Sequence, residues 1–334
     1  MTRLDAMALV VQLLVPLLLL ARVALGRHRS GLALSMEAAM VALFLWAVAR
    51  GGFWLALPWT TPLILSGLLL AATVLAVGRL RARKAPVPGR CGVWGLGVRG
   101  LLLAAVAGVL LFVASGARPL PKTPVELAFP LADGTYLVAA GGSNSWVNHH
   151  LMTLTRERFL PYRGQSYGVD LVKLGGWGSR RSGGLVRDLT DYAIFGEAIR
   201  APCGGPVVRA GDSASGTEGR FAALVGSHVI LSCGRAWIVM AHMQPGSVRV
   251  ARGDTVEAGT ILGLVGNSGK SHEPHLHIHA QTPGSVAAPL SGAPLPLTFN
   301  GRHLVRNHRI SVEKAHQLQQ ASRFDPDHAS EPEQ

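Results

Sequence analysis

The sequence predicts two structural parts: an N-terminal transmembrane module of four α-helices and a C-terminal all-β domain of the sandwich or barrel type. Four long apolar runs within residues 1–118, followed by short β-branched runs separated by Gly and Pro, predict this division. Residues 1–118 also hold 12 Lys and Arg against two acidic residues, within a net charge of +13 for all 334 residues. Because this positive charge lies between apolar runs and not on a folded basic face, it argues against a nucleic-acid-binding protein.

The four apolar runs have the length of membrane spans. A helix needs roughly 17–20 apolar residues to cross a hydrocarbon core about 30 Å thick, and each run provides them. The first run resembles a signal peptide, but it lacks a convincing small-residue cleavage site and three further runs follow it. We therefore expect spans at about 5–21, 31–49, 60–78 and 100–117.

Basic loops predict the orientation of this module. Residues 22–30 carry three Arg and residues 79–99 carry six Lys and Arg, whereas residues 50–59 carry only Arg50. Cationic loops stay in the cytoplasm, so the first and third loops are expected inside. The N-terminus and everything after residue 118 then lie on the opposite side of the membrane.

Three further residues bear on this topology. Glu37 lies within the second span, where a carboxylate is costly and is either functional or, as we favour, protonated or paired with a neighbouring helix. Cys203 and Cys233 both lie outside, where an oxidising compartment would allow a disulfide. The sequence leaves open whether they pair.

The C-terminal part has a sequence pattern typical of β structure. Pro119, Pro121 and Pro124 predict a stiff linker over 119–128, followed by a folded domain over 129–310 and a polar tail over 311–334. Residues 175–191, rich in Gly and Ser, predict a long excursion beside a groove. Strands are expected at Tyr136–Ala140, Tyr167–Val172, Pro206–Ala210, His228–Ser232, Trp237–His242, Ile261–Val265 and His275–Ala280.

Histidines of the last expected strand are the first candidates for chemistry. Side chains alternate along a strand, so His275, His277 and His279 share one face. Neutral imidazole is both a good zinc ligand and a base, which suits three such rings to metal binding and proton transfer. A solvated polar strand is the alternative.

Further motifs lie in a fixed order ahead of this strand. They are Gly168-Val169-Asp170, Ala241-His242, Gly253-Asp254-Thr255-Val256 and the Gly-rich stretch 259–269, which together precede His275-Leu276-His277. Over about residues 130–285 this series resembles the lysostaphin/LytM-type zinc metallopeptidases. The resemblance implies that Asp170 and His277 bind Zn²⁺, that His275 is the catalytic histidine beside the metal, and that His242 assists it by stabilising the tetrahedral product.

One element departs from the family pattern. The first zinc ligand should stand four residues before Asp170, but that position is Ser166, whose hydroxyl is a poor substitute for imidazole. Residues 141–150 resemble the Gly-Gly-x-Asn…Asn-x-His segment of a divergent branch, in which His150 would be the replacement ligand. If the segment is extended, His149 points the opposite way. The alternatives are that His149 is the ligand, or that no zinc binds.

The resemblance implies a membrane-anchored zinc metalloendopeptidase that hydrolyses peptide bonds of cell-wall peptidoglycan with a zinc-activated water. Its partners would be peptidoglycan peptides and the lipid bilayer, with the C-terminal domain on the periplasmic or extracellular side of a bacterial cytoplasmic membrane. Four spans exceed what an anchor requires, which suggests a membrane protein partner that the sequence does not identify. Ser166 motivates the alternative, a catalytically inactive LytM-like domain that binds wall peptides or activates another hydrolase.

Overall fold

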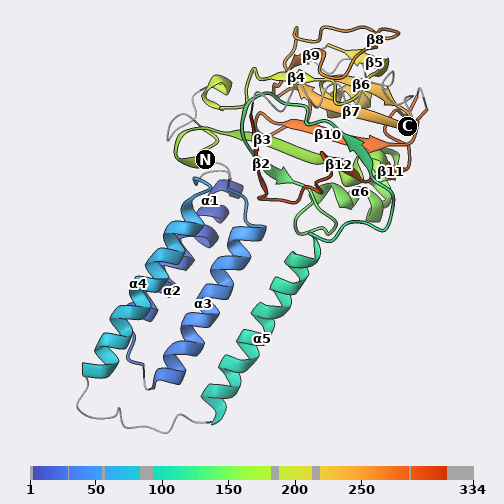
Figure 1. The fold of residues 1–334 in the computed structure, drawn as a ribbon. Helices are drawn as coiled ribbons and strands as arrows, with labels where there is room; N and C mark the ends of the chain where they lie inside the picture. The colour runs from blue at the N-terminus through green and yellow to red at the C-terminus, as the bar shows by residue number, and fades with distance from the viewer. Residues whose placement is uncertain are drawn as a thin grey trace, which may run out of the picture. The chain divides into compact units, whose positions relative to one another are not determined.

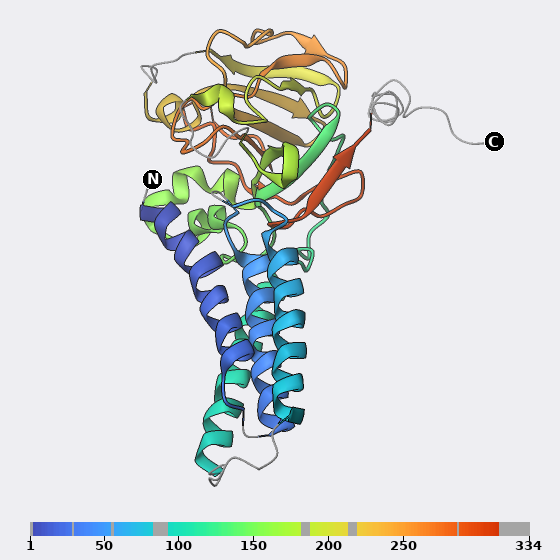
Figure 2. The ribbon, with the colours of Figure 1, turned by 90° about the vertical axis from the view of Figure 1, so that its left-hand side faces the viewer.

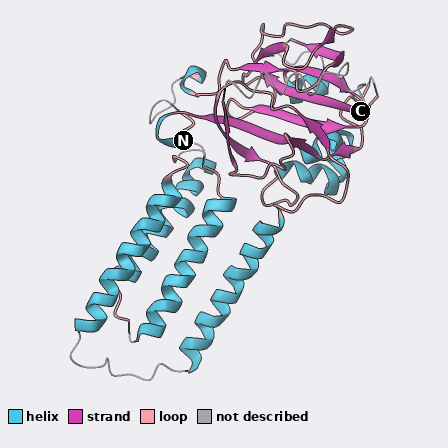
Figure 3. Cartoon of the chain, in the orientation of Figure 1, coloured by secondary structure: helices cyan, strands magenta, loops and turns pink. Residues whose placement is uncertain are grey.

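The chain divides into two compact units, Met1–Ser115 and Gly116–Gln334. The computed structural model describes residues 3–28, 30–54, 57–82, 93–181, 188–212, 219–285 and 287–313. The expected tail beyond residue 313 and the centre of the basic loop 79–99 lie outside the described residues. Figure 3 shows that the first unit is helical and the second rich in strands, which confirms the predicted fold class.

Apolar helices build the first unit, as its runs of Leu, Ala and Val favour. Helix α3 packs against α4 and α5, and α2 packs against α4 (Figure 2). The Arg79 guanidinium at the end of α4 donates to the Ala24 carbonyl at the end of α2 (2.8 Å), so these two ends lie together. The helices are α1 (Arg3–Leu9), η1 (Val10–Leu14), α2 (Val15–Leu25), α3 (Gly31–Gly51), α4 (Thr61–Ala82) and α5 (Val93–Ser115).

The expected number of spans needs a correction. Among the described residues, three helical segments are long and apolar enough to cross a membrane: Ala6–Leu25, Gly31–Gly51 and Thr61–Ala82. The fourth expected span, 100–117, falls in α5, but its apolar part, Gly100–Ser115, is shorter than these three. Arg99 interrupts the apolar run on one side, and the helix ends before Gly116 on the other.

Glu37 is paired within the helical unit. Its side chain is buried in α3, and the Arg22 Nε of α2 donates to its Oε1 at 2.5 Å. His28, also buried, places Nδ1 3.6 Å from the second carboxylate oxygen. A buried carboxylate needs such partners, so the structure agrees with the paired alternative for Glu37.

A large antiparallel sheet organises the second unit (Figure 1). Within the described residues it has nine strands in the order β13-β2-β3-β10-β7-β6-β5-β8, with β11 paired to β10. Two small sheets join β1 (Val125–Leu127) to β12 (Leu297–Phe299) and β4 (Ala198–Arg200) to β9 (Ile261–Leu264). The strands of the large sheet are β2 (Gly134–Ala140), β3 (Val169–Leu174), β5 (Gly205–Gly211), β6 (Ser227–Cys233), β7 (Ala236–Met243), β8 (Thr255–Val256), β10 (Leu276–Gln281), β11 (Pro294–Leu295) and β13 (Arg309–Val312).

Alternation along the central strands separates the main core from a polar face. Leu276, Ile278 and Ala280 of β10 belong to the main hydrophobic core. The residues between them, His277, His279 and Gln281, are buried on the opposite face. The same alternation in β3 puts Val169 and Leu171 in the core and Asp170 on the other face. The sheet thus carries its chemical groups on the side away from its core.

Two features of this unit concern earlier expectations. Val125–Leu127 forms strand β1, which pairs in parallel with β12 (Leu297–Phe299), so part of the expected linker 119–128 belongs to a sheet. Cys203 and Cys233 form a disulfide with a Cα–Cα distance of 6.1 Å, which settles the pairing that the sequence left open. This disulfide joins the residues just before β5 to the end of β6.

Candidate active site

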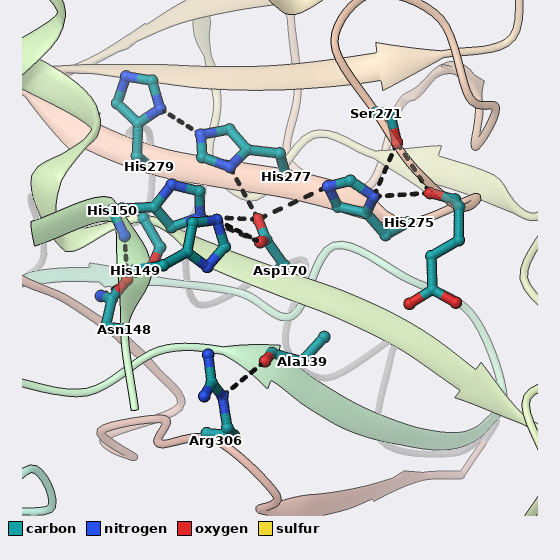
Figure 4. A network of polar contacts seen from close by, with 12 residues as sticks. Ala139, Asn148, His149, His150, Asp170, Ser271, His275, His277, His279 and Arg306 are labelled. Carbon is teal, nitrogen blue, oxygen red and sulfur yellow. Dashed lines mark hydrogen bonds and ion pairs between the residues drawn. The ribbon is translucent and has the colours of Figure 1, made fainter. Parts of the chain in front are cut away.

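A buried carboxylate, Asp170, forms the centre of the site (Figure 4). It lies in β3 directly opposite His277 of β10, because the two strands pair in that register. His277 Nδ1 is 2.8 Å from Asp170 Oδ1, and both side chains are almost completely buried. The β-sheet itself therefore brings together two residues that are 107 positions apart in the sequence.

His150 approaches the same carboxylate from a helical turn. Its Nε2 is 3.1 Å from Oδ1 and 3.0 Å from Oδ2 of Asp170. The 3₁₀ turn η2 (His149–Leu151) carries it, and the Asn148 side chain caps this turn by accepting from the His150 backbone N–H. The Asn148 amide also donates to the Gly142 and Gly168 carbonyls, which fixes the turn beside β3.

His149 corrects one expectation. An extended segment would point His149 away from His150. Residues 149–151 are instead helical, so both rings lie at the site. Its Nε2 lies 3.9 Å from Asp170 Oδ2, and its ring packs on His150 at a centroid distance of 4.1 Å. The His149 side chain is 49% exposed, whereas that of His150 is 11% exposed and that of His277 is 4% exposed. Of these three rings, that of His149 is the most exposed to solvent.

His275 and His242 lie next to the cluster and are oriented by backbone carbonyls. The His275 Nδ1–H donates to the Glu273 carbonyl (2.8 Å), and its Nε2 is 3.7 Å from Asp170 Oδ1. The His242 Nδ1–H donates to the Ser268 carbonyl (2.9 Å). Since a carbonyl can only accept, both rings carry a hydrogen on Nδ1, and in the neutral ring Nε2 then has the lone pair. Their centroids are 4.8 Å apart.

The orientation of His242 depends on an unusual backbone. Met240, two residues earlier in β7, points into the main core, and strict alternation would send His242 there too. A φ of +62° at His242 breaks the alternation, so the ring lies beside His275 and, at a centroid distance of 5.9 Å, His277. Left-handed backbone is rare outside Gly and Asn, and it is often found at functional sites.

Burial keeps three imidazoles of this site neutral, those of His242, His277 and His279. Desolvation lowers the pKa of His277, and it lowers the pKa values of His242 and His279 well below their ordinary value. Burial alone would raise the pKa of Asp170, but its contacts with the His150, His275 and His277 rings hold it well below its usual range. Neutral rings around an ionised carboxylate are the protonation states that a metal ion requires of its ligands.

The donor set fits zinc. His149, His150 and Asp170 offer ligand atoms within 4.8 Å of one another, and His277 Nδ1 contacts the same carboxylate. Zn²⁺ binds imidazole nitrogen and carboxylate oxygen at about 2.0–2.2 Å, so neighbouring ligands of a tetrahedral site lie about 3.3 Å apart. The distances of 2.8–3.1 Å from Asp170 to His150 and His277 are close to this spacing.

Ser166, at the position of the missing family ligand, has a structural role. It is fully buried, and its hydroxyl contacts the Thr153 hydroxyl at 2.7 Å. Thr153 in turn donates to the His150 carbonyl (2.7 Å). Ser166 therefore supports the turn that carries His150.

Residues to which the sequence assigned no role hold the site in place. Gly168 leaves the space that the His277 and His150 rings occupy, since a Cβ there would lie 2.7 Å from His277 Cε1. Arg306, almost completely buried, donates to the Ala139 and Trp146 carbonyls on either side of residues 141–145 (Figure 4). Arg180, in the 175–191 excursion, forms a buried ion pair with Glu273. The positions of Arg306 and Arg180 in the sequence do not predict these contacts, because their partners lie far away in the chain.

Part of the chain matches a known family of peptidases. Residues 188–289 match the model of peptidase family M23, a range that includes His242, His275 and His277 but begins after His150 and Asp170. The chain is 24% identical to the catalytic domain of the prophage-encoded M23 protein EnpA of Enterococcus faecalis, covering 40% of this chain and 78% of that one with a TM-score of 0.27.

Two other solved structures are similar to the chain. Lysostaphin of Staphylococcus simulans is 23% identical, covering 37% of this chain and 40% of that one with a TM-score of 0.25. A zinc-containing peptidase of Vibrio cholerae is 17% identical, covering 39% and 30% with a TM-score of 0.24. Among curated proteins no match is found.

Proposed function

From the premise that this chain carries a domain of peptidase family M23, we propose that it is a membrane-anchored zinc metalloendopeptidase that hydrolyses peptide bonds of peptidoglycan. The observation that carries the proposal is the convergence of His150 and His277 on Asp170, with the Nε2 lone pairs of His275 and His242 beside them. Two neutral imidazoles and one carboxylate leave a fourth position of a tetrahedral zinc site open, as in catalytic zinc sites.

His150, Asp170 and His277 would hold the metal. We prefer His277 to His149 as the third ligand because its ring is buried and its second nitrogen is engaged by His279 at 2.9 Å. A bound Zn²⁺ would supply Lewis acidity toward the scissile carbonyl and the attacking water. His149, half exposed and 3.9 Å from Asp170 Oδ2, is not a ligand in this proposal.

His275 is the proton carrier of the proposed reaction. Its Nε2 lone pair accepts a proton from the water whose oxygen bonds to the carbonyl carbon. The same nitrogen then donates this proton to the leaving amine as the C–N bond breaks. His242 Nε2 also bears a lone pair, so it stabilises a developing oxyanion only after it has been protonated there.

The proposed location is the outer face of a bacterial cytoplasmic membrane. The basic segments at the ends of α2 and α4 lie together through Arg79 and Ala24, as one cytoplasmic side requires. The Cys203–Cys233 disulfide supports an oxidising compartment for the second unit. Peptidoglycan is the peptide polymer found there.

Hydrolysis of isolated peptidoglycan by the full chain in detergent tests this function. We expect the wild type to release new free amino groups, and a chelator to abolish the release until Zn²⁺ is restored. His275→Ala should keep its zinc but lose at least about 100-fold in rate, since it removes the general base. Zinc binding without hydrolysis would instead support the catalytically inactive alternative, in which the domain binds wall peptides or activates another hydrolase.

A further inference from the structure

A third histidine of β10 lies directly behind the proposed ligand His277. The alternation of the strand puts His277, His279 and Gln281 in one column on the face away from the core. His277 Nε2 and His279 Nδ1 are 2.9 Å apart, and Figure 4 shows this contact continuing the line from Asp170. All three residues are at most 3% exposed.

The contact constrains where His277 carries its hydrogen. His277 Nδ1 faces Asp170 Oδ1, so this nitrogen must offer a lone pair if a cation is to bind beside the carboxylate. A neutral ring then has its hydrogen on Nε2, which needs a buried acceptor. His279 Nδ1 is in position to be that acceptor, which leaves the hydrogen of His279 on its own Nε2.

Gln281 completes the column. His279 Nε2 and Gln281 Oε1 are buried, and neither has a hydrogen-bond partner among the described residues. The Gln281 amide nitrogen donates to the Pro289 carbonyl (2.6 Å), which leaves Oε1, on the other side of the amide group, to accept a hydrogen bond. Gly164 leaves room for this amide, because a Cβ there would lie 1.7 Å from Oε1.

With a cation bound at Asp170, only one arrangement of hydrogens satisfies the column. If both rings carry their hydrogen on Nε2, His277 donates to His279 and His279 has Gln281 Oε1 as its acceptor. With the hydrogens on Nδ1, His279 Nε2 and Gln281 Oε1 are two acceptors without a donor, and buried polar atoms without partners are strongly disfavoured.

We propose that His279, held by Gln281, is a positioning residue that keeps the Nδ1 lone pair of His277 directed at the metal site and so raises the affinity of the chain for zinc. The proposal rests on the zinc site of the proposed function. Partners behind a metal ligand commonly change metal affinity by 10- to 100-fold, because they fix the tautomer and the orientation of the ligand.

Zinc affinity of the full chain in detergent, measured by competition with a chromogenic chelator, tests the proposal. His279→Phe fills the same space without an acceptor, and we expect it to weaken zinc binding by about 10- to 100-fold. His279→Asn is the matched control, because its Oδ1 can accept where His279 Nδ1 does. It should restore the affinity to within about threefold of the wild type. Circular dichroism of the metal-free variants checks that they fold.

The outcomes separate this proposal from the proposed function. If the wild type binds zinc and His279→Phe binds it equally well, or if Phe and Asn weaken binding equally, His279 only packs and the inference is wrong. If the wild type binds no zinc, the proposed metallopeptidase and the inference both fail. Should His279→Phe not fold, Gln281→Leu tests the column from its other end, and unchanged zinc affinity would overturn the inference.

Discussion

Asp170 shows how a single residue depends on its burial and its neighbours. A buried carboxylate is costly unless it is compensated, and here imidazole nitrogens of His150, His275 and His277 lie within 3.7 Å of its oxygens. Each of these rings is more than four-fifths buried. The site therefore stays organised while most of its rings are neutral, which is the state that suits a metal ion.

The neutral rings predict that the second unit loses stability in acid. His242, His277 and His279 have pKa values below their ordinary value of 6.5, so below pH 6.5 the unfolded chain binds more protons than the folded chain. The free energy of unfolding should then fall as pH drops, by up to about 1.4 kcal/mol per pH unit for each such group. Asp170, whose pKa is depressed, adds a loss in the same direction below about pH 4.

Denaturant unfolding of the chelator-treated chain between pH 7 and pH 5 measures this dependence. His242→Gln removes one of the titrating rings, and its slope should be shallower than that of the wild type. Identical slopes would show that His242 is not held neutral by the fold.

Gly168→Ala tests the space around the two proposed histidine ligands. A Cβ at this position would lie 2.7 Å from His277 Cε1, 2.9 Å from the Gln165 carbonyl and 3.3 Å from His150 Cδ2. The Gln165 carbonyl belongs to the backbone and cannot easily give way, so the His277 and His150 rings must move. We expect the zinc affinity to fall at least about tenfold, as it does when other groups around metal ligands are changed. Gly176→Ala, where nothing lies within 4 Å of the added Cβ, is the matched control. Equal affinities in both variants would contradict the described packing.

Individual residues differ in how far the sequence could predict them. Strand periodicity is enough to put His277 and His279 on one face, and the resemblance to the family motifs implies that Asp170 binds metal with His277. The side of His149 depends on a 3₁₀ turn, and the direction of His242 depends on a positive φ, neither of which the spacing of residues reveals. The contributions of Gly168, Arg306 and Ser268 depend on tertiary contacts between segments far apart in the chain.

At the scale of elements, strands were easier to predict than their connections. Each expected strand overlaps a strand of the structure, because runs of β-branched residues bounded by Gly and Pro mark strands in the sequence. The 175–191 excursion begins with the short turn η4 (Gly176–Gly178), and the Arg180–Glu273 ion pair ties it to the residues just before His275. No local pattern predicts that pairing, because its partners are 93 positions apart.

The disulfide between the segment before β5 and the end of β6 should stabilise the second unit. It closes a loop with a sequence separation of 30, for which the loss of chain entropy in the unfolded state gives about 3–4 kcal/mol. The Cys203→Ser, Cys233→Ser double variant should lose roughly this amount in denaturant unfolding. Dithiothreitol should destabilise the wild type similarly and leave the double variant unchanged. If dithiothreitol left the free energy of unfolding of the wild type unchanged, that result would contradict the disulfide.

At the scale of the whole molecule, the number of membrane spans determines on which side of the membrane the second unit lies. Three segments qualify as spans among the described residues, yet α5, with 23 residues, is about 34 Å long and matches the thickness of a bilayer core. If α5 crosses as well, the N-terminus and the β domain share one side of the membrane. The basic loops then predict that this side is outside.

Reporter fusions test this topology. Alkaline phosphatase fused after Ala117 should be active, because it folds only in an oxidising compartment, and a fusion within residues 83–92 should be inactive. An inactive fusion after Ala117 would place the second unit in the cytoplasm and remove peptidoglycan as its substrate.

The zinc content of the purified full chain, measured by mass spectrometry in the wild type and in His150→Ala and His149→Ala, tests the convergence of His150, Asp170 and His277 most directly. We predict about one zinc per chain in the wild type, little in His150→Ala and an unchanged content in His149→Ala, since three protein ligands form a catalytic zinc site. Full zinc in His150→Ala, or no zinc in the wild type, would contradict this metal site.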